Sequence, residues 1–79
     1  MTALPAINVD PQIMLGKPVI AGTRISVELL LEKLAAGETA EQIQRAHPHL
    51  PPGSLEAALK YAVEVLRHET IIPLNRKSA

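Results

Sequence analysis

Hydrophobic and polar residues alternate only near the start of this chain, whereas farther along the hydrophobic residues recur at helical spacing. Residues 7–9 alternate, and two runs that contain β-branched residues, 17–20 and 23–27, lie on either side of Gly22. Short runs of this kind are typical of strands, and a glycine between two of them supplies the positive φ that a tight turn needs. The pattern therefore predicts strands near 7–9, 18–20 and 24–26, the last two joined as a hairpin.

The segment 27–36 carries a strong helical pattern. Its hydrophobic residues recur at the i, i+3, i+4, i+7 spacing of a buried helix face: Val27, Leu30, Leu31 and Leu34. Ser26 precedes them as a suitable N-cap, because a serine hydroxyl accepts a hydrogen bond from a free N–H of the first turn. Gly37 follows them, and glycine readily adopts the left-handed conformation that ends many helices. A first helix is thus predicted near 27–36.

Two further helices are predicted after this one. Thr39 and Gln42 have the spacing of a capping box, so a second helix is expected near 40–47. A third helix is expected near 52–69, because Pro52 suits a first helical position and a hydrophobic stripe follows it. The members of that stripe are predicted to form the core face of the third helix: Leu55, Ala58, Leu59, Ala62 and Leu66.

These elements predict a mainly α fold, a homeodomain-like helix-turn-helix domain of three helices with a short N-terminal β-hairpin. We expect residues 1–70 to form this single domain and residues 71–79 to form an extended C-terminal tail. The tail opens with the apolar segment Ile71, Ile72, Pro73 and Leu74. Such a segment either forms a strand against the domain's own β front or docks on a partner, and the sequence does not decide between the two.

The composition indicates that the domain gains stability from a second copy. The chain has 79 residues and is 47% hydrophobic, with a single aromatic residue. Domains this small bury a limited core and usually add disulfides, a metal or oligomerisation. The chain contains no cysteine, which excludes disulfides and thiolate metal sites. We therefore expect at least a homodimer.

The charge balance and the apolar runs limit the partners further. The formal net charge is zero, which disfavours sequence-independent nucleic-acid binding because such binding needs a positive excess. No signal peptide is predicted, since the first residues lack a basic start followed by a long apolar run. No apolar stretch approaches the roughly 18 residues of a membrane span. We expect a cytoplasmic protein without membrane contact.

No group of residues suggests catalysis, a cofactor or a metal site. None of the carboxylates stands beside a candidate nucleophile, and the chain has no glycine-rich phosphate loop. His47, His49 and His68 lack the spacing of zinc ligands. We expect instead a partly buried His47 at a helix end and an exposed His49. The protein is therefore expected not to be an enzyme and to bind no cofactor.

A larger set of residues carries a family resemblance. It comprises Ile7, Asp10-Pro11, the run from Gly16 to Val27, Gly37, Glu41, Ile43, the run from His47 to Leu50 and the run from Ala57 to Ala62. Over these positions the chain resembles domain-of-unknown-function family 433. The resemblance implies a homeodomain-like helical domain with a short β front. It also implies the antitoxin of a type II toxin–antitoxin pair, with a PIN-like ribonuclease as the toxin.

On this hypothesis the protein is a non-catalytic inhibitor that masks the active site of its toxin. A PIN-like nuclease gathers carboxylates around Mg²⁺, so a basic group placed there competes with metal or RNA charge. The predicted partner-binding residues are Arg24, Ile71, Ile72, Leu74, Arg76 and Lys77. For Arg24 the sequence favours a structural role over a functional one. In the structural role, Arg24 pairs with Asp10 or with a helix C-terminus.

An alternative function is a helix-turn-helix DNA-binding transcriptional regulator that controls its own operon. The third helix would read DNA, yet it offers few side chains suited to base edges, and Glu56 would repel phosphate. The residues predicted to make weak DNA contacts are Arg45, Ser54, Lys60 and Arg67. A third alternative is a purely structural interaction module.

Overall fold

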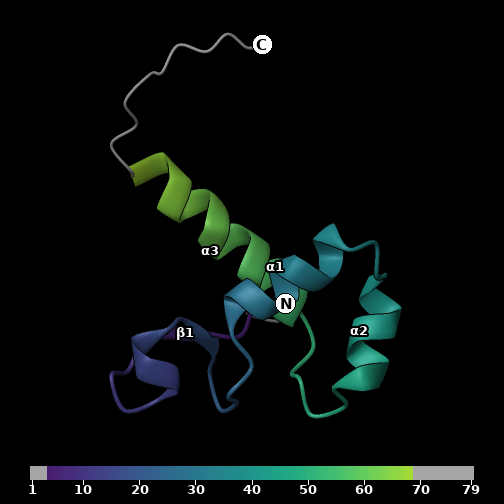
Figure 1. The fold of residues 1–79 in the computed structure, drawn as a ribbon, viewed down its shortest axis with the longest axis horizontal. Coiled ribbons are helices and arrows are strands. Elements are labelled where there is room, and N and C mark those ends of the chain that lie inside the picture. Colours follow the sequence, from purple (N-terminus) through teal and green to yellow (C-terminus); the bar gives the residue numbers. More distant parts are fainter. Residues whose placement is uncertain (1–3, 69–79) are drawn as a thin grey trace, which may run out of the picture.

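A computed structural model describes residues 4–68 of the chain. In chain order its elements are the strand β1 (Ile7–Asn8), a 3-10 turn (Met14–Gly16), the strand β2 (Val19–Ile20), and the helices α1 (Val27–Ala35), α2 (Ala40–Ala46) and α3 (Ser54–His68). Figure 1 shows α1 and α3 above a small β front, with α2 on the right at about the height of the β front. The prediction of a mainly helical, three-helix domain with a short N-terminal β-hairpin is confirmed.

The β front consists of β1 paired antiparallel with β2, with Ile7 opposite Ile20 and Asn8 opposite Val19. The predicted strand at 24–26 does not form, and a single bridge from Val19 to Ser26 takes its place. Two local bonds explain this difference. The backbone N–H of Ile25 donates to the Thr23 hydroxyl at 3.0 Å, and Ser26 is already committed as the N-cap of α1.

The predicted tight turn at Gly22 is confirmed. Thr23 N–H donates to the carbonyl of Ile20 at 3.0 Å, and Gly22 adopts a φ of 80°. A residue with positive φ at this place in a turn is favoured as glycine because a Cβ would be strained. The turn sends the chain back beside β2, where Ile20 N–H donates to the carbonyl of Ile25 at 3.0 Å.

The ends of α1 and α2 follow from local chemistry. The Ser26 hydroxyl accepts a hydrogen bond from Leu29 N–H at 3.0 Å. Gly37, with a φ of 96°, ends α1 through bonds from the N–H groups of residues 37 and 38 to carbonyls of the last turn. Thr39 and Gln42 form the expected capping box, with bonds of 3.1 and 2.8 Å. All three predicted signals are confirmed.

The start of α3 differs from the prediction, because the helix begins at Ser54 rather than at Pro52. Both the hydroxyl and the N–H of Ser54 donate to the carbonyl of Pro51, at 2.6 and 3.2 Å. Gly53 lies just before the helix with a φ of 84°, and its carbonyl accepts from Ala57 N–H at 2.9 Å. Residues 51–53 thus form a turn that buries Ser54 instead of a first helical turn.

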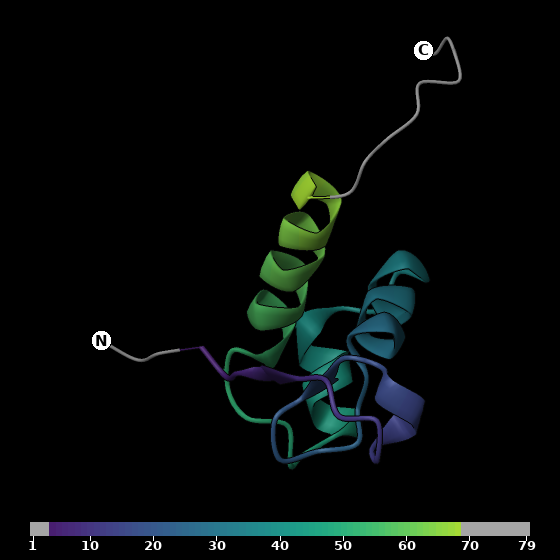
Figure 2. The same cartoon turned by 90° about the vertical axis from the view of Figure 1, so that its left-hand side faces the viewer.

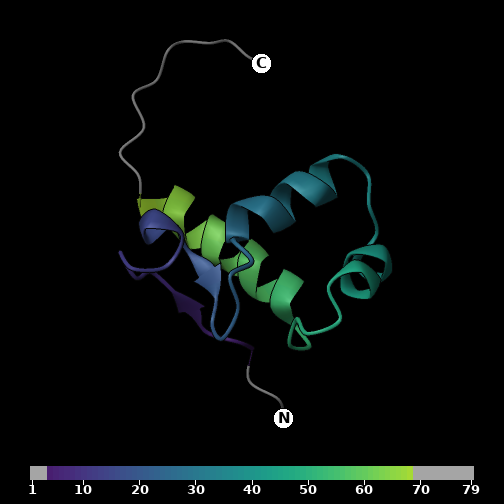
Figure 3. The ribbon, with the colours of Figure 1, turned by 60° about the horizontal axis from the view of Figure 1, so that its bottom comes forward.

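The hydrophobic core lies where β2 and the three helices meet. Its buried members are Val19, Ile20, Val27, Leu30, Ile43, Leu50, Ala57 and Ala58. Helix α1 contacts both α2 and α3, and α3 also contacts β1 and β2. Figure 3 shows α1 lying across α3, and Figure 2 shows the C-terminal half of α3 extending beyond this core. Helix α3 therefore contributes to the core through its first turns alone.

The predicted core stripe of α3 is partly wrong. Ala58 is buried, but Leu59 is 47% exposed and Leu66 is 59% exposed. The fully buried residues of the helix are Ser54, Ala57 and Ala58, which are all small, and Leu55 and Tyr61 pack against the core from a partly buried position. Because successive helical residues are rotated by about 100°, the line of leucines is rotated by roughly the same angle from Ser54. Leu59 and Leu66 therefore lie on the flank of α3 and not on its buried face.

We expect Leu30→Ala to lower the free energy of unfolding by about 2–5 kcal/mol, because Leu30 is fully buried and its loss leaves a cavity. The matched control is Leu15→Ala, since Leu15 is 95% exposed and packs against almost nothing. Urea denaturation followed by circular dichroism measures both variants. Equal losses in the two variants would show that the core has been placed incorrectly.

Candidate functional site

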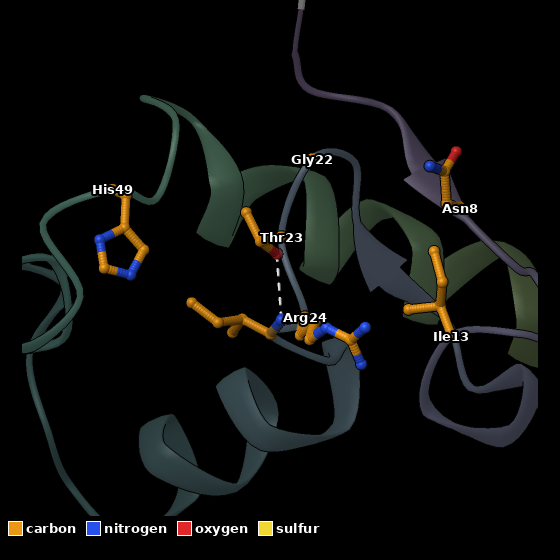
Figure 4. Close-up of a pocket in the computed structure, with 7 residues that line it drawn as sticks. Asn8, Ile13, Gly22, Thr23, Arg24 and His49 are labelled. Atoms are coloured by element: carbon orange, nitrogen blue, oxygen red, sulfur yellow. Dashed lines mark hydrogen bonds between the residues drawn. The ribbon is translucent and has the colours of Figure 1, made fainter.

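Arg24 lies at the edge of a hollow on the β front. The hollow has a volume of about 530 Å³ and is lined by Asn8, Ile13, Gly22, Thr23, Arg24, Ile25 and His49. Figure 4 shows the Arg24 side chain extending from the loop that follows Gly22. The loop is held rigidly, because the Thr23 hydroxyl donates to the carbonyl of Ile20 at 2.8 Å while it accepts from Ile25 N–H. The guanidinium of an exposed residue is thus presented on a fixed backbone.

The sequence favoured a pairing of Arg24 with Asp10 or with a helix C-terminus. The ion pair with Asp10 does not form in the described residues. A carboxylate oxygen of Asp10 instead accepts a hydrogen bond from the backbone N–H of Gln12 at 2.9 Å. The nearest cation on the same side, Lys17, is already paired with Glu28 at 3.2 Å. Of these two basic groups, only Arg24 has no carboxylate partner there.

A left-handed turn stands beside Arg24. Met14 and Leu15 have φ values of 51° and 57°, and Gly16 completes the turn at 84°. A left-handed backbone costs a residue other than glycine roughly 1–2 kcal/mol. The turn nevertheless holds Leu15 almost wholly in solvent, and Met14 shares a second hollow with Arg24. Strain that exposes an apolar side chain is typical of a binding surface rather than of a core.

This left-handed turn was hard to predict from the sequence. Gly16 was its one signal, because Met and Leu rarely adopt positive φ. The turn is closed by bonds from Gly16 N–H to Ile13 O at 3.0 Å and from Lys17 N–H to Met14 O at 3.1 Å. Such closure depends on the antiparallel pairing of β1 with β2 on either side of the turn. Local propensity alone could not reveal it.

A second candidate surface is an apolar groove between α1 and α3. It has a volume of about 600 Å³ and is lined by Pro18, Val27, Glu28, Leu31, Glu32, Ala35, Tyr61, Ala62, Val65 and Leu66. Glu28 and Glu32 are exposed and make its α1 side acidic. The predicted partner-binding residues of the tail lie outside the described residues: Ile71, Ile72, Leu74, Arg76 and Lys77. Of the predicted partner-binding set, the structure therefore places Arg24 alone.

The residues predicted to contact DNA do not gather on one surface. Ser54 is only 2% exposed, and its hydroxyl donates to the carbonyl of Pro51. Lys60 and Arg67 are exposed about two turns apart on α3, and Arg67 lies 3.4 Å from Glu64. Arg45 is exposed on α2. The start of α3 thus presents no basic side chain for base contacts.

The histidines lie as the sequence indicated. His47 caps the C-terminal end of α2 and is partly buried, and His49 is exposed beside the hollow of the β front. The Nε2 atom of His47 is buried and has no hydrogen-bond partner within residues 4–68. In the part of the chain that the structure describes, no three His, Cys, Asp or Glu residues are grouped to hold a metal ion. None of the described helices is long and apolar enough to cross a membrane.

Comparison with known proteins yields one match. The model of a family described as "Protein of unknown function (DUF433)" matches residues 7–62. No curated protein and no solved structure matches the chain. The matched range covers β1, the left-handed turn, the Arg24 loop, α1, α2 and the first half of α3. Both candidate surfaces therefore include residues of the matched range.

We expect the isolated protein to bind DNA weakly, because its net charge is zero and the first turn of α3 carries no basic residue. Binding should fall steeply as salt is raised, and Arg45→Ala or Lys60→Ala should weaken it further. Fluorescence anisotropy with DNA duplexes from the region upstream of this chain's gene measures both effects. Nanomolar binding to one operator at physiological salt would contradict this expectation.

Proposed function

This chain belongs to the DUF433 family, and from that membership we propose that it is an antitoxin, a non-catalytic inhibitor of a PIN-like ribonuclease. The observation that carries the proposal is the β front, where a strained turn holds Leu15 in solvent and its neighbour Met14 lines a hollow together with Arg24. An apolar anchor beside an arginine is the composition that concentrates binding energy in protein interfaces. A rigid backbone on both sides lowers the entropy lost on binding.

The charge of Arg24 suits the expected target. A PIN-like active site gathers carboxylates around Mg²⁺, and a guanidinium remains charged at any working pH and binds a carboxylate through two parallel hydrogen bonds. Arg24 has no carboxylate partner of its own among residues 4–68, so it is available for such contacts. An Arg24 side chain placed among those carboxylates would compete with the metal and with RNA. Inhibition then requires no chemistry from the antitoxin itself.

The test is inhibition of the ribonuclease encoded beside this chain's gene. Arg24→Glu should weaken inhibition at least about tenfold, since it replaces an attractive contact with a repulsive one. The matched control is Lys17→Met, because Lys17 lies on the same hollow but is already paired with Glu28. A neighbouring gene without such a nuclease, or a nuclease that the chain leaves active, would overturn the proposal.

Leu15→Gly separates binding from folding in the same assay. Glycine accepts a φ of 57° without strain, and removal of an almost fully exposed side chain loses little packing. We expect an unchanged melting temperature and weaker inhibition of the nuclease. A variant that inhibits as well as the unchanged protein would show that this turn is not part of the toxin-binding surface.

We also expect the C-terminal segment to contribute to toxin binding. Deletion of residues 71–79 should leave the helical circular dichroism signal and the melting temperature nearly intact, because the core lies within residues 19–58. The truncated protein should lose inhibition, and Arg76→Ala with Lys77→Ala should weaken it less. If the truncated protein melts early or aggregates, the segment is structural instead.

A further inference from the structure

Helix α3 carries a line of apolar residues that the core uses only in part, through Leu55 at its start. Leu55, Leu59, Ala62 and Leu66 are separated by four, three and four positions, and this spacing keeps them on one side of a helix. Leu59 and Leu66 are about half exposed, Leu55 and Ala62 are partly buried, and Val63 beside them is 46% exposed. We call these four residues the leucine seam. Water covers much of it in a single copy of the domain.

The spacing of the leucine seam is that of the contact positions between two packed helices. Its C-terminal part opens onto the α1–α3 groove, because Ala62 and Leu66 belong to both. A helix laid along the seam would therefore also contact the apolar wall formed by Leu31 and Val65. Burial of exposed aliphatic side chains supplies the driving force, at about 25 cal/mol for each Å² removed from water.

The charges beside the leucine seam identify the occupant. Glu56 directly follows Leu55, and Arg67 directly follows Leu66. If two α3 helices pack antiparallel with Leu55 opposite Leu66 of the partner subunit, Glu56 comes to lie beside Arg67 of the partner subunit. The twofold axis repeats this contact, so one dimer gains two ion pairs. In a parallel pair, positions 56 and 67 stay about 16 Å apart along the axis and do not meet.

We propose that this chain forms a symmetric dimer in which the α3 helices pack antiparallel through the leucine seam, with Glu56 paired to Arg67 of the partner subunit. The surface is self-complementary in the order of its apolar residues and charges, which is the property that an interface between identical copies requires. Arg67 can form this pair because its contact with Glu64, at 3.4 Å between two exposed side chains, is weak. The inference does not depend on the antitoxin proposal.

The first test measures mass by light scattering across micromolar concentrations. The unchanged protein should have the mass of a dimer, and Leu66→Lys should have the mass of a monomer. The control is Leu15→Lys, which places the same charge on an exposed leucine of the β front and should remain dimeric. Circular dichroism confirms that each variant is folded. A monomeric unchanged protein, or a dimer that tolerates Leu66→Lys, would overturn the proposal.

Charge reversal tests the ion pair without disturbing the apolar contact. Glu56→Lys alone and Arg67→Glu alone should each weaken the dimer about 3- to 10-fold, because each sets like charges together twice. The double variant exchanges the charges and should restore most of the affinity. Sedimentation gives the three dissociation constants. A double variant weaker than both single variants would contradict the antiparallel pairing.

Cross-linking tests the orientation directly, since the chain has no cysteine of its own. A variant with both Glu56→Cys and Arg67→Cys should yield a covalent dimer with a bismaleimide shorter than the roughly 16 Å between these positions on one helix. Each single variant should yield little, because identical positions lie far apart in an antiparallel pair. Efficient cross-linking of the single variants would indicate a parallel dimer and overturn the proposal. Cross-linking that appears only after a nuclease toxin is added would also overturn the proposal.

Discussion

The position of α3 depends on its three small buried residues, Ser54, Ala57 and Ala58. Small side chains let the helix approach β2 and α1 closely, and they fill the space beside the larger buried side chains Ile20 and Leu30. Close packing of this kind contributes dispersion energy that a leucine face could not match without pushing the helix outward. As a consequence, the long aliphatic side chains of α3 are left on its flank.

This arrangement separates two surfaces. Figures 1 and 2, which share a vertical axis, place the β front at one end of the domain and the last turns of α3 at the other. The β front offers one guanidinium and one strained, exposed leucine, whereas the flank of α3 offers several aliphatic side chains and balanced charges. An apolar anchor beside an arginine suits a different partner protein, and a self-complementary stripe suits a second copy.

Local signals in the sequence predicted the ends of α1 and α2 well, because capping depends on residues within one turn. Ser26, Gly37 and the Thr39–Gln42 box all act as expected. The buried face of α3 could not be predicted in the same way. Apolar residues cover well over half of that helix's circumference, so periodicity alone could not choose between the alanine face and the leucine face.

The features of the candidate site were less predictable for a related reason. The strand expected at 24–26 was prevented by the competing bonds of Thr23 and Ser26, which are side-chain interactions that β propensity does not include. Arg24 was expected to pair with Asp10 or with a helix C-terminus; within residues 4–68 the pair with Asp10 does not form, and Asp10 accepts a hydrogen bond from Gln12 N–H. In both cases a short polar side chain forms a hydrogen bond with nearby backbone, and this local bond competes with the predicted interaction.

The two proposals combine, because the proposed dimer would affect both toxin binding and the stability of the domain. A dimer built on the leucine seam would present two β fronts, because the twofold axis repeats every surface. Two linked binding sites raise the effective affinity for a partner that is itself dimeric or bound nearby, without any new contact. Burial of the leucine seam would also add to the stability of a domain in which eight hydrophobic residues are buried within residues 4–68. Loss of the dimer would then weaken inhibition even when Arg24 and Leu15 are intact. On dilution, the dimer should dissociate first and inhibition should weaken afterwards. A variant with direct damage to the β front should instead inhibit weakly while it is still a dimer.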